Sequence, residues 1–389
     1  MKTPLQLAQL YRSFTIATRR RFHQYPELSH QEIQTTAYIK EQLEVMGIPY
    51  VCPAPTGVIA VIQGAKPGKT MGLRADIDAL PIQELNEGPY SSRNPGIMHA
   101  CGHDAHGAAL LTAAKILQEL RQQFSGTVKL IFQPAEEHLP SGALAMMAKG
   151  HLDDCAAFFG LHVKSDLPVG RITLEEGPRM AASAGIAIRI TGKGGHGGQP
   201  HQTVDAALTA AAALMNLQTL VSRELDPQKT VVVTIGSFHA GTAKNIIAQE
   251  AFLEGTCRFF DPALEEDLRR GITRILSCTA EAYRAKAEVE VSPGCPAVIN
   301  DPKLSALGRL AVLALWPEDK LILYPPSAGN EDFSYYARIA PALYVGIGSG
   351  NPDKGSDYPH HHPRFDIDED MLEDAAALYA QYALAFLNQ

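Results

Sequence analysis

Apolar and polar residues follow two different patterns along this chain. Over the first 180 residues, short apolar runs bounded by turn residues predict buried strands, and stretches with helical spacing lie between them. The predicted strands cover residues 58–63, 71–75, 127–133 and 156–161. The predicted helices cover residues 4–23, 29–46 and 106–122, and Ser29 with Glu32 has the spacing of a capping box. Strands that alternate with helices predict an α/β fold with a mostly parallel sheet flanked by helices.

The pattern changes between residues 181 and 292. Four predicted strands and two predicted helices occur there in the order βαββαβ, which is the ferredoxin-like unit. They are strands 184–191, 230–237, 250–259 and 287–291 and helices 203–221 and 261–284. The α/β pattern then resumes, with helices at 302–314 and 369–387 around a strand at 342–346. We therefore expect residues 1–180 and 293–389 to form one discontinuous domain and residues 181–292 an inserted domain.

Composition narrows the class of protein. A hydrophobic content of 46% with 20% charged residues is typical of a globular chain, and the net charge of -8 argues against a nucleic-acid partner. The longest basic run, Arg19-Arg20-Arg21, is interpreted as decorating one face of the first helix. No segment has the apolar length of a membrane span or the form of a secretory signal. The six cysteines are scattered, which favours reduced thiols and a cytoplasmic protein.

Four short stretches carry side chains that bind metal ions. They are residues 99–106, 133–137, 160–162 and 360–363. Thiolate, imidazole and carboxylate are ligands for borderline-soft divalent cations. Each stretch borders an apolar run, and ligands bind at the carboxyl ends of strands in parallel sheets. The two outer parts of the chain must therefore pack together to assemble one metal site.

The first two stretches also have structural interpretations. Cys101 and His103 alternate, so an extended backbone would direct both to one side, and a helix beginning near His106 would favour the thiolate. Taken alone, they also fit a buried cysteine among loop histidines. Glu136 and Glu137 would point in different directions, one toward a metal and the other toward a water, or would form a solvated acidic turn. Their combination favours a metal site.

The remaining candidates leave alternatives open. His162 is expected at the end of a strand, where it is either a ligand or a core histidine. Of the triplet His360-His361-His362, only one member needs to bind metal. The segment Gly194-Gly195-His196-Gly197-Gly198 permits close backbone approach, or it is a flexible turn with an exposed histidine.

These stretches, together with residues 73–81, 193–201, 245–258 and 329–333, resemble a known family. It is the family of metal-dependent amidohydrolases and metallopeptidases that contains aminoacylases and dipeptidases. The resemblance is strongest to the branch of hippurate hydrolases, N-acetyldiaminopimelate deacetylases and indoleacetyl-amino-acid hydrolases, and it covers nearly the whole chain. It implies a catalytic domain with a two-metal site and an inserted lid domain through which the protein forms a homodimer.

The resemblance also implies roles for residues. Cys101 would bridge two divalent ions of zinc, manganese or nickel, and the other ligands would be His103, Glu137, His162 and His361. Counting back from Pro363 selects His361 from the triplet. Asp76 stands where other branches carry a metal-binding histidine, and it is not assigned as a ligand. Glu136 would be the general base.

Other roles implied by the resemblance concern the substrate. His196 would reach the substrate oxyanion in its own or the partner's site, while Asn245 and Arg258 would contact a substrate carboxylate. A structural ion pair at a strand edge is the alternative for Arg258. Asp78 would support a ligand from behind, and Glu331 would either line the pocket or hold a ligand from behind. The expected reaction is deacylation of an N-acyl amino acid by a metal-activated water. A dipeptidase or carboxypeptidase on the same site is the alternative, and a non-catalytic metal-binding scaffold is a third reading that the presence of Glu136 disfavours. A serine hydrolase lacks support because no Gly-x-Ser-x-Gly elbow occurs in the sequence.

Overall fold

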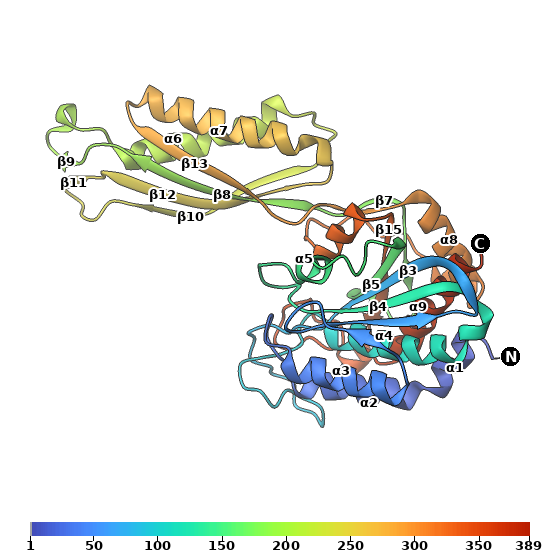
Figure 1. Cartoon of the computed structure of the whole chain (residues 1–389). Coiled ribbons are helices and arrows are strands. Elements are labelled where there is room, and N and C mark those ends of the chain that lie inside the picture. The colour runs from blue at the N-terminus through green and yellow to red at the C-terminus, as the bar shows by residue number, and fades with distance from the viewer. Residues whose placement is uncertain (1) are drawn as a thin grey trace. The chain divides into compact units, whose positions relative to one another are not determined.

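The computed structural model describes residues 2–389, which divide into two compact units (Figure 1). The larger unit comprises the chain up to Arg179 together with Ile299–Pro325 and Asp332–Gln389. The inserted unit comprises Met180–Val298 and Pro326–Glu331. It thus takes in residues 326–331, which the hydrophobic pattern assigned to the outer domain. The amide of Ala181 explains this, because it donates hydrogen bonds to the carbonyl oxygens of Ser327 and Gly329.

Seven strands form the sheet of the larger unit, in the spatial order β1-β2-β4-β3-β5-β15-β6. They are β1 (Tyr50–Val51), β2 (Val58–Gln63), β3 (Lys66–Asp76), β4 (Ser125–Gln133), β5 (Cys155–Pro168), β6 (Ile172–Thr173) and β15 (Ala342–Gly350). The four central strands β4, β3, β5 and β15 are parallel, whereas β1, β2 and β6 pair antiparallel toward the two edges. The predicted mostly parallel sheet is confirmed.

Helices of the larger unit flank this sheet. They are α1 (Pro4–Leu10), α2 (Arg12–Gln24), α3 (Ile33–Val45), α4 (His103–Glu119), α5 (Gly142–Met147), α8 (Pro302–Leu313) and α9 (Met371–Leu387), with the short 3-10 helices η1 (Arg121–Gln123), η5 (Glu318–Lys320), η6 (Asp332–Arg338) and η7 (Pro352–Lys354). Neighbouring residues of β5 show that both faces are covered. Phe158 stacks on Tyr336 of η6, whereas Phe159 stacks on Tyr382 of α9. Successive side chains of a strand point to opposite faces, so η6 and α9 lie on opposite sides of the sheet.

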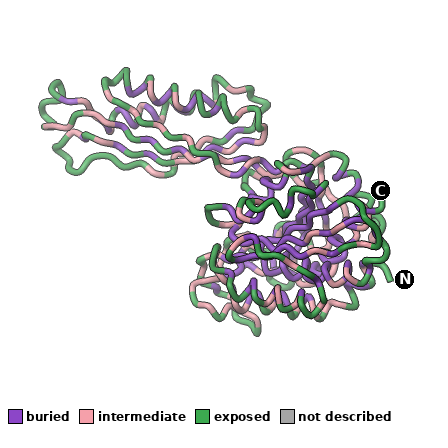
Figure 2. The backbone as a smooth tube through the Cα atoms, viewed as in Figure 1, coloured by how far each residue is buried: buried purple, intermediate pink, exposed green. Residues whose placement is uncertain are grey.

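Three helix boundaries differ from the predictions. The first predicted helix is two helices, broken at Tyr11, although Pro4 does occupy the first turn. Ser29 does not cap α3, which begins at Ile33, because its hydroxyl donates to Asp78 instead. Helix α4 begins at His103 rather than near His106, and almost all of it is buried. Figure 2 shows that the buried residues of the larger unit are concentrated in the central strands and in the helices packed against them.

The inserted unit has the predicted order βαββαβ. Its elements are β8 (Ala182–Thr191), α6 (Ala206–Thr219), β10 (Val231–Ala240), β12 (Glu250–Phe259), α7 (Glu265–Ala282) and β13 (Lys286–Pro293). The strands form an antiparallel sheet in the order β10-β12-β8-β13, and apolar residues of one sheet face pack against both helices in a separate core. Strand β10 is an edge of this sheet. The alternating burial along its strands is the pattern of a sheet with one core face and one solvated face.

Shorter elements complete the chain. They are β7 (Gly177–Met180), β9 (Gly195–His196), β11 (Ile246–Ile247), β14 (Val298–Asn300), the 3-10 helices η2 (Pro200–Gln202) and η4 (Pro262–Leu264), and the π-helical turn η3 (Leu220–Glu224). Strand β9 pairs with β11, and β7 pairs with β14. Across residues 2–389, none of the helices has both the length and the apolar character needed to cross a membrane.

Candidate metal centre

The candidate ligands converge at the carboxyl ends of the central strands. Strands β3 and β4 end side by side, with Asp76 opposite Gln133, and the segment that carries Glu136 and Glu137 follows β4. His162 does not end its strand as predicted. It lies within β5, opposite Gly346 of β15, because pairing with β15 continues the strand to Pro168.

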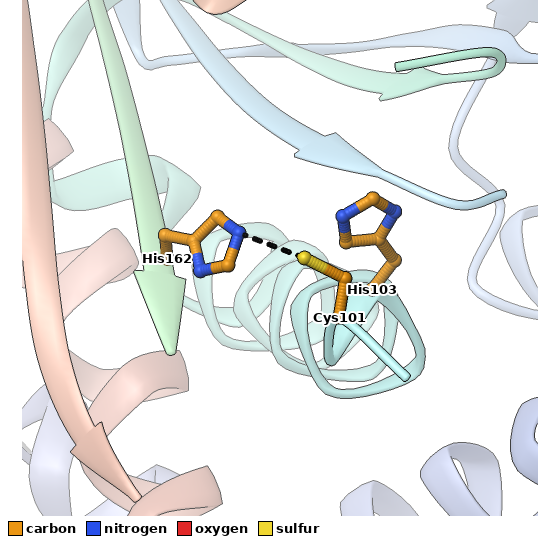
Figure 3. A group of neighbouring side chains, drawn as sticks. All are labelled: Cys101, His103 and His162. Atoms are coloured by element: carbon orange, nitrogen blue, oxygen red, sulfur yellow. Dashed lines mark hydrogen bonds between the residues drawn. The ribbon is translucent and has the colours of Figure 1, made fainter. Parts of the chain in front are cut away.

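Cys101, His103 and His162 form one group of potential ligands (Figure 3). The Cys101 sulfur lies 3.5 Å from Nε2 of His162. The backbone between Cys101 and His103 is not extended, as the alternation suggested, because α4 already begins at His103. Gly102 makes the turn with φ +88°, and a Cβ there would meet Cγ2 of Val163 at 2.3 Å. Only glycine fits this left-handed, crowded position, which brings both side chains to the site.

Two further groups overlap with the first. Cys101, Glu137 and His361 form the second, and His103, Glu136 and Glu137 form the third. Within each group the potential ligand atoms lie within 4.8 Å of one another. The structure therefore brings together all five predicted ligands and the predicted general base, from segments more than 250 residues apart.

The three histidines of the triplet make different contacts. His361 has φ +65°, donates its amide to the carbonyl of Ala100 at 2.8 Å, and places Nε2 3.2 Å from Oε1 of Glu137. His360 also faces the centre, with Nδ1 3.7 Å from the Cys101 sulfur. The ring of His362 stacks on Tyr358, and its Nδ1 accepts the amide of Arg364. Among residues 2–389, His361 is the member of the triplet that shares a group with a carboxylate and the thiol.

Asp78 orients two of the candidate ligands. Its Oδ1 lies 3.1 Å from Nδ1 of His103, and its Oδ2 accepts hydrogen bonds from the amide of Glu137 at 3.0 Å and from Ser29. Nε2 of His103 is buried and has no hydrogen-bond partner among residues 2–389. A histidine held at one nitrogen by a carboxylate, with the other nitrogen bare, is the usual arrangement of a metal ligand. These residues therefore fit a divalent cation.

Burial and neighbouring charges shift the pKa values of two candidate ligands in the site. Burial raises the pKa of the Cys101 thiol to about 12, and the Glu137 carboxylate acts in the same direction. Burial therefore outweighs the lowering of the thiol pKa that was expected from the dipole of the following helix. A cation would have to displace the thiol proton in order to bind. Burial alone would lower the pKa of His103, but Asp76 and Asp78 raise it well above its ordinary value. These carboxylates favour positive charge at the position that a cation would occupy.

Comparison with known proteins assigns the family. The model of peptidase family M20/M25/M40 matches residues 72–385, which is most of the chain. The chain belongs to this family. It is therefore a hydrolase of amide bonds, related to amidohydrolases, deacetylases and carboxypeptidases, and the resemblance described above is confirmed.

Relatives with established names illustrate the range of the M20/M25/M40 family. The N-acetyl-L-cysteine deacetylase of Bacillus subtilis is 39% identical over 99% of this chain and 91% of its own length. IAA-amino acid hydrolase ILR1-like 4 of Arabidopsis thaliana is 37% identical over 96% of this chain and 85% of its own length. Thermostable carboxypeptidase 1 of Saccharolobus solfataricus is 36% identical over 96% of this chain and 95% of its own length. Among solved structures, the Bacillus subtilis YXEP protein, described as a dinuclear metal-binding peptidase, superposes with a TM-score of 0.87 at 35% identity over 98% of this chain and 99% of that one.

The remaining predicted residues of this M20/M25/M40 chain lie in the inserted unit. His196 on β9 is exposed, and the neighbouring Gly197 donates its amide to the carbonyl of Asn245, so the structure brings His196 and Asn245 together. Arg258 on β12 donates a hydrogen bond to the side chain of Asn330. Glu331 is buried at the end of the segment 326–331.

Sequence reasoning missed a buried ionic cluster behind the metal centre. Arg19 does not decorate a helix face. It is fully buried and donates to Asp104 at 2.8 Å and to Asp366 at 2.5 Å. His23, one turn later on α2, contacts Asp104 at 2.8 Å and Glu84 at 3.2 Å. The i, i+4 spacing of Arg19 and His23 was visible in the sequence, but their acidic partners lie at least 60 residues away.

This cluster predicts a pH dependence of stability. Burial and Arg19 would lower the pKa of His23, but Asp104 and Glu84 raise it from 6.5 to about 9. Folding therefore favours the protonated form, and this contribution is complete below pH 6.5 and is lost as the pH rises through about 9. We expect His23 to contribute roughly 2–4 kcal/mol that disappears across this interval.

Urea unfolding of the wild type and of His23→Gln across this pH range measures the effect. The wild type should lose more stability than the variant as the pH rises. His151→Asn, at an exposed histidine, is the matched control and should follow the wild type. Parallel pH profiles for wild type and His23→Gln would contradict the prediction.

Proposed function

We propose that this protein is a metal-dependent amidohydrolase that removes the acyl group from N-acyl amino acids. The observation that carries the proposal is the convergence of three overlapping ligand groups on Cys101 and Glu137 at the carboxyl ends of the central strands. Relatives named as an N-acetyl-L-cysteine deacetylase and an indoleacetyl-amino-acid hydrolase support this substrate class. Both relatives match nearly the whole of this chain, which supports proposing the same substrate class for it.

In this proposal two divalent ions would be held by Cys101, His103, Glu137, His162 and His361. When bound, the ions would polarise the amide carbonyl and lower the pKa of a water. The donor set of thiolate, imidazole and carboxylate suits zinc, manganese or nickel. Asp78 holds His103 and Glu137 in place by the contacts described above.

Glu136 is the proposed general base. It would accept a proton from the attacking water and pass it to the leaving nitrogen, so that a carboxylic acid and a free amino acid form. Its segment is held from outside the centre, because the amide of Ala135 donates to Oε1 of the buried Glu32 at 2.8 Å. Ala135 has φ +47°, so this contact fixes an unusual backbone turn directly before the base.

A panel of substrates tests the function. Purified protein should contain up to two equivalents of divalent metal and should hydrolyse at least one of the N-acetyl, benzoyl and indoleacetyl amino acids faster than a dipeptide with a free amine. Removal of metal with a chelator should abolish the activity, and added metal should restore it. Faster hydrolysis of the dipeptide would instead assign the chain as a dipeptidase or carboxypeptidase, which the relative named as a thermostable carboxypeptidase makes the second candidate.

The inserted unit is proposed to form a homodimer and to serve as a lid. In this unit His196 and Asn245 come together beside the short β9–β11 pair, and the edge strand β10 exposes Val232 and Phe238. Edge strands with exposed apolar residues are suited to pairing with a second chain. We propose that His196 stabilises the substrate oxyanion, that Asn245 and Arg258 contact a substrate carboxylate, and that Glu331 supports the site.

Mixing two inactive variants tests whether His196 acts in the partner's site. In a mixed dimer of Glu136→Gln and His196→Ala, one site combines an intact Glu136 with the partner's intact histidine. The mixture should regain about a quarter of the wild-type activity, since half of random pairs are mixed and each holds one complete site. Recovery of no activity from a mixture shown to exchange subunits would place His196 in its own subunit's site.

The exposed thiols of Cys52 and Cys278 support a cytoplasmic location, because such thiols persist in reducing compartments. Cell fractionation of the producing organism tests this, and recovery of the protein from an oxidising compartment would contradict it.

A further inference from the structure

Two buried residues beside the metal centre, Asp76 and His106, are not explained by the proposed ligand set. With His103 they form a further group that has the composition of a metal site. Both side chains are fully buried. Their hydrogen bonds decide whether they can bind a cation.

Asp76 is committed to protein partners at both oxygens. Its Oδ1 lies 2.5 Å from Nδ1 of His106, and its Oδ2 accepts a hydrogen bond from the guanidinium of Arg74 at 2.6 Å. Each oxygen of Asp76 is therefore occupied by a hydrogen-bonding partner within the protein.

The hydrogen bonds of His106 fix its tautomer. Nε2 accepts the backbone amide of Val163 at 2.9 Å, so this nitrogen carries no proton and its lone pair is occupied. Nδ1 must then carry the proton and donate to Asp76. Neither nitrogen keeps a lone pair for a cation, which excludes His106 from the ligand set despite its position.

The amide that His106 accepts belongs to the residue after a proposed ligand. Pairing of β3 with β5 ends at Arg74 opposite Gly160, so the amide of Val163 lies beyond the last paired residue of β3. The carbonyl of Val163 contacts Nδ1 of His162 at 2.6 Å. His106 and His162 thus hold the two backbone polar groups of the same residue, and their rings meet edge to face at 4.7 Å.

We propose that the Asp76–His106 pair is a positioning device that holds the backbone at Val163 so that Nε2 of His162 faces the Cys101 sulfur. His106 supplies the acceptor that β3 no longer provides, and Asp76 fixes the tautomer that makes it an acceptor. The device rests on the assignment of His162 as a ligand in the proposed function. Asp76 would then act on the metal site through His106 and would not itself be a ligand.

Two substitutions of His106 separate this role from simple packing. The oxygen of His106→Gln can replace Nε2 as the acceptor for Val163, whereas the amide of His106→Asn can replace Nδ1 as the donor to Asp76 but leaves Val163 without an acceptor. His151→Asn is the matched control at an exposed histidine. Zinc chloride is titrated into each metal-free protein by calorimetry, and bound zinc is measured by elemental analysis.

We expect His106→Asn to weaken zinc binding at one site about 10–100-fold, the usual cost of losing a partner behind a ligand, while His106→Gln stays close to the wild type. Wild-type zinc affinity in His106→Asn would overturn the proposal. Equal losses in both variants would also overturn it, because they would show that the imidazole itself is needed. Zinc binding is measured without any substrate. The proposal about His106 can therefore fail while the proposed hydrolase function stands, and the hydrolase function can fail while the proposal about His106 stands.

A measurement on the wild type covers the case in which His106→Asn does not fold. In protein labelled with 15N at histidine, the His106 resonances should report a proton on Nδ1 both before and after zinc is added. Those of His103 and His162 should move on binding. A zinc-induced change at Nε2 of His106 that matches the change at His162 would make His106 a ligand and overturn the proposal.

Discussion

Glu136→Gln should lower the turnover number by about 10²- to 10⁴-fold, the range that general-base catalysis contributes, while the protein keeps its metal ions. The amide has the shape of the carboxylate but cannot accept a proton from water. Glu136 shares a ligand group with His103 and Glu137, so its carboxylate lies beside the candidate ligands, where it would accept a proton from the attacking water. The measurement is kcat on the best N-acyl amino acid, together with elemental analysis of the purified variant.

Glu137→Gln is the matched control, because it makes the same chemical change one residue away. Glu137 contacts His361, and its backbone amide donates a hydrogen bond to Asp78, as expected for a ligand held from behind. We expect this variant to lose metal as well as activity. Unchanged turnover in Glu136→Gln would remove that residue from the mechanism, and loss of metal in Glu136→Gln alone would exchange the two roles.

Arg74→Leu should destabilise the metal-free protein by about 3–5 kcal/mol, the usual cost of breaking a buried ion pair at one partner. Arg74 is fully buried and donates to Asp76 at 2.6 Å, to Asp332 at 2.8 Å and to Gln133 at 2.8 Å. The substitution would leave two buried carboxylates without their shared counter-ion. Urea unfolding at neutral pH measures the loss.

Arg12→Leu provides the comparison at the surface. Arg12 pairs with Asp370 and Glu373, but its side chain is 40% exposed. Water and salt screen such pairs, so the loss should stay within about 1 kcal/mol. A similar loss of stability in both variants would show that the buried network of Arg74 contributes no more than a surface ion pair.

Much of the fold could be predicted from the sequence because it depends on local patterns. The apolar runs predicted the central strands, and the order βαββαβ predicted the inserted unit, since burial of one face imposes a period on each element. Boundaries were less well predicted where a tertiary contact decides them. Ser29 was expected to cap α3, but its hydroxyl bonds to Asp78, almost 50 residues away.

The chemistry of the centre could also be predicted from the sequence, as far as residue types go. The clustered cysteine, histidines and glutamates indicated a metal site, and the structure brings Cys101, His103, Glu137, His162 and His361 into overlapping groups. Their roles as ligands stay a prediction. The pattern could not show which side chains face the site, because that depends on turns such as the one at Gly102, where φ is +88°.

The sequence by itself determined which segments become strands and helices and which residue types are available for the centre. Only the tertiary structure decided which of these groups are paired with one another. Arg19 was expected at the surface and is buried against Asp104 and Asp366, and His106 is turned toward Asp76 and Val163. The physical reason is that periodicity reports the burial of a face, whereas the partner of a buried charge can come from any distance along the chain. Arg74 and Asp332, separated by 258 positions, show this plainly.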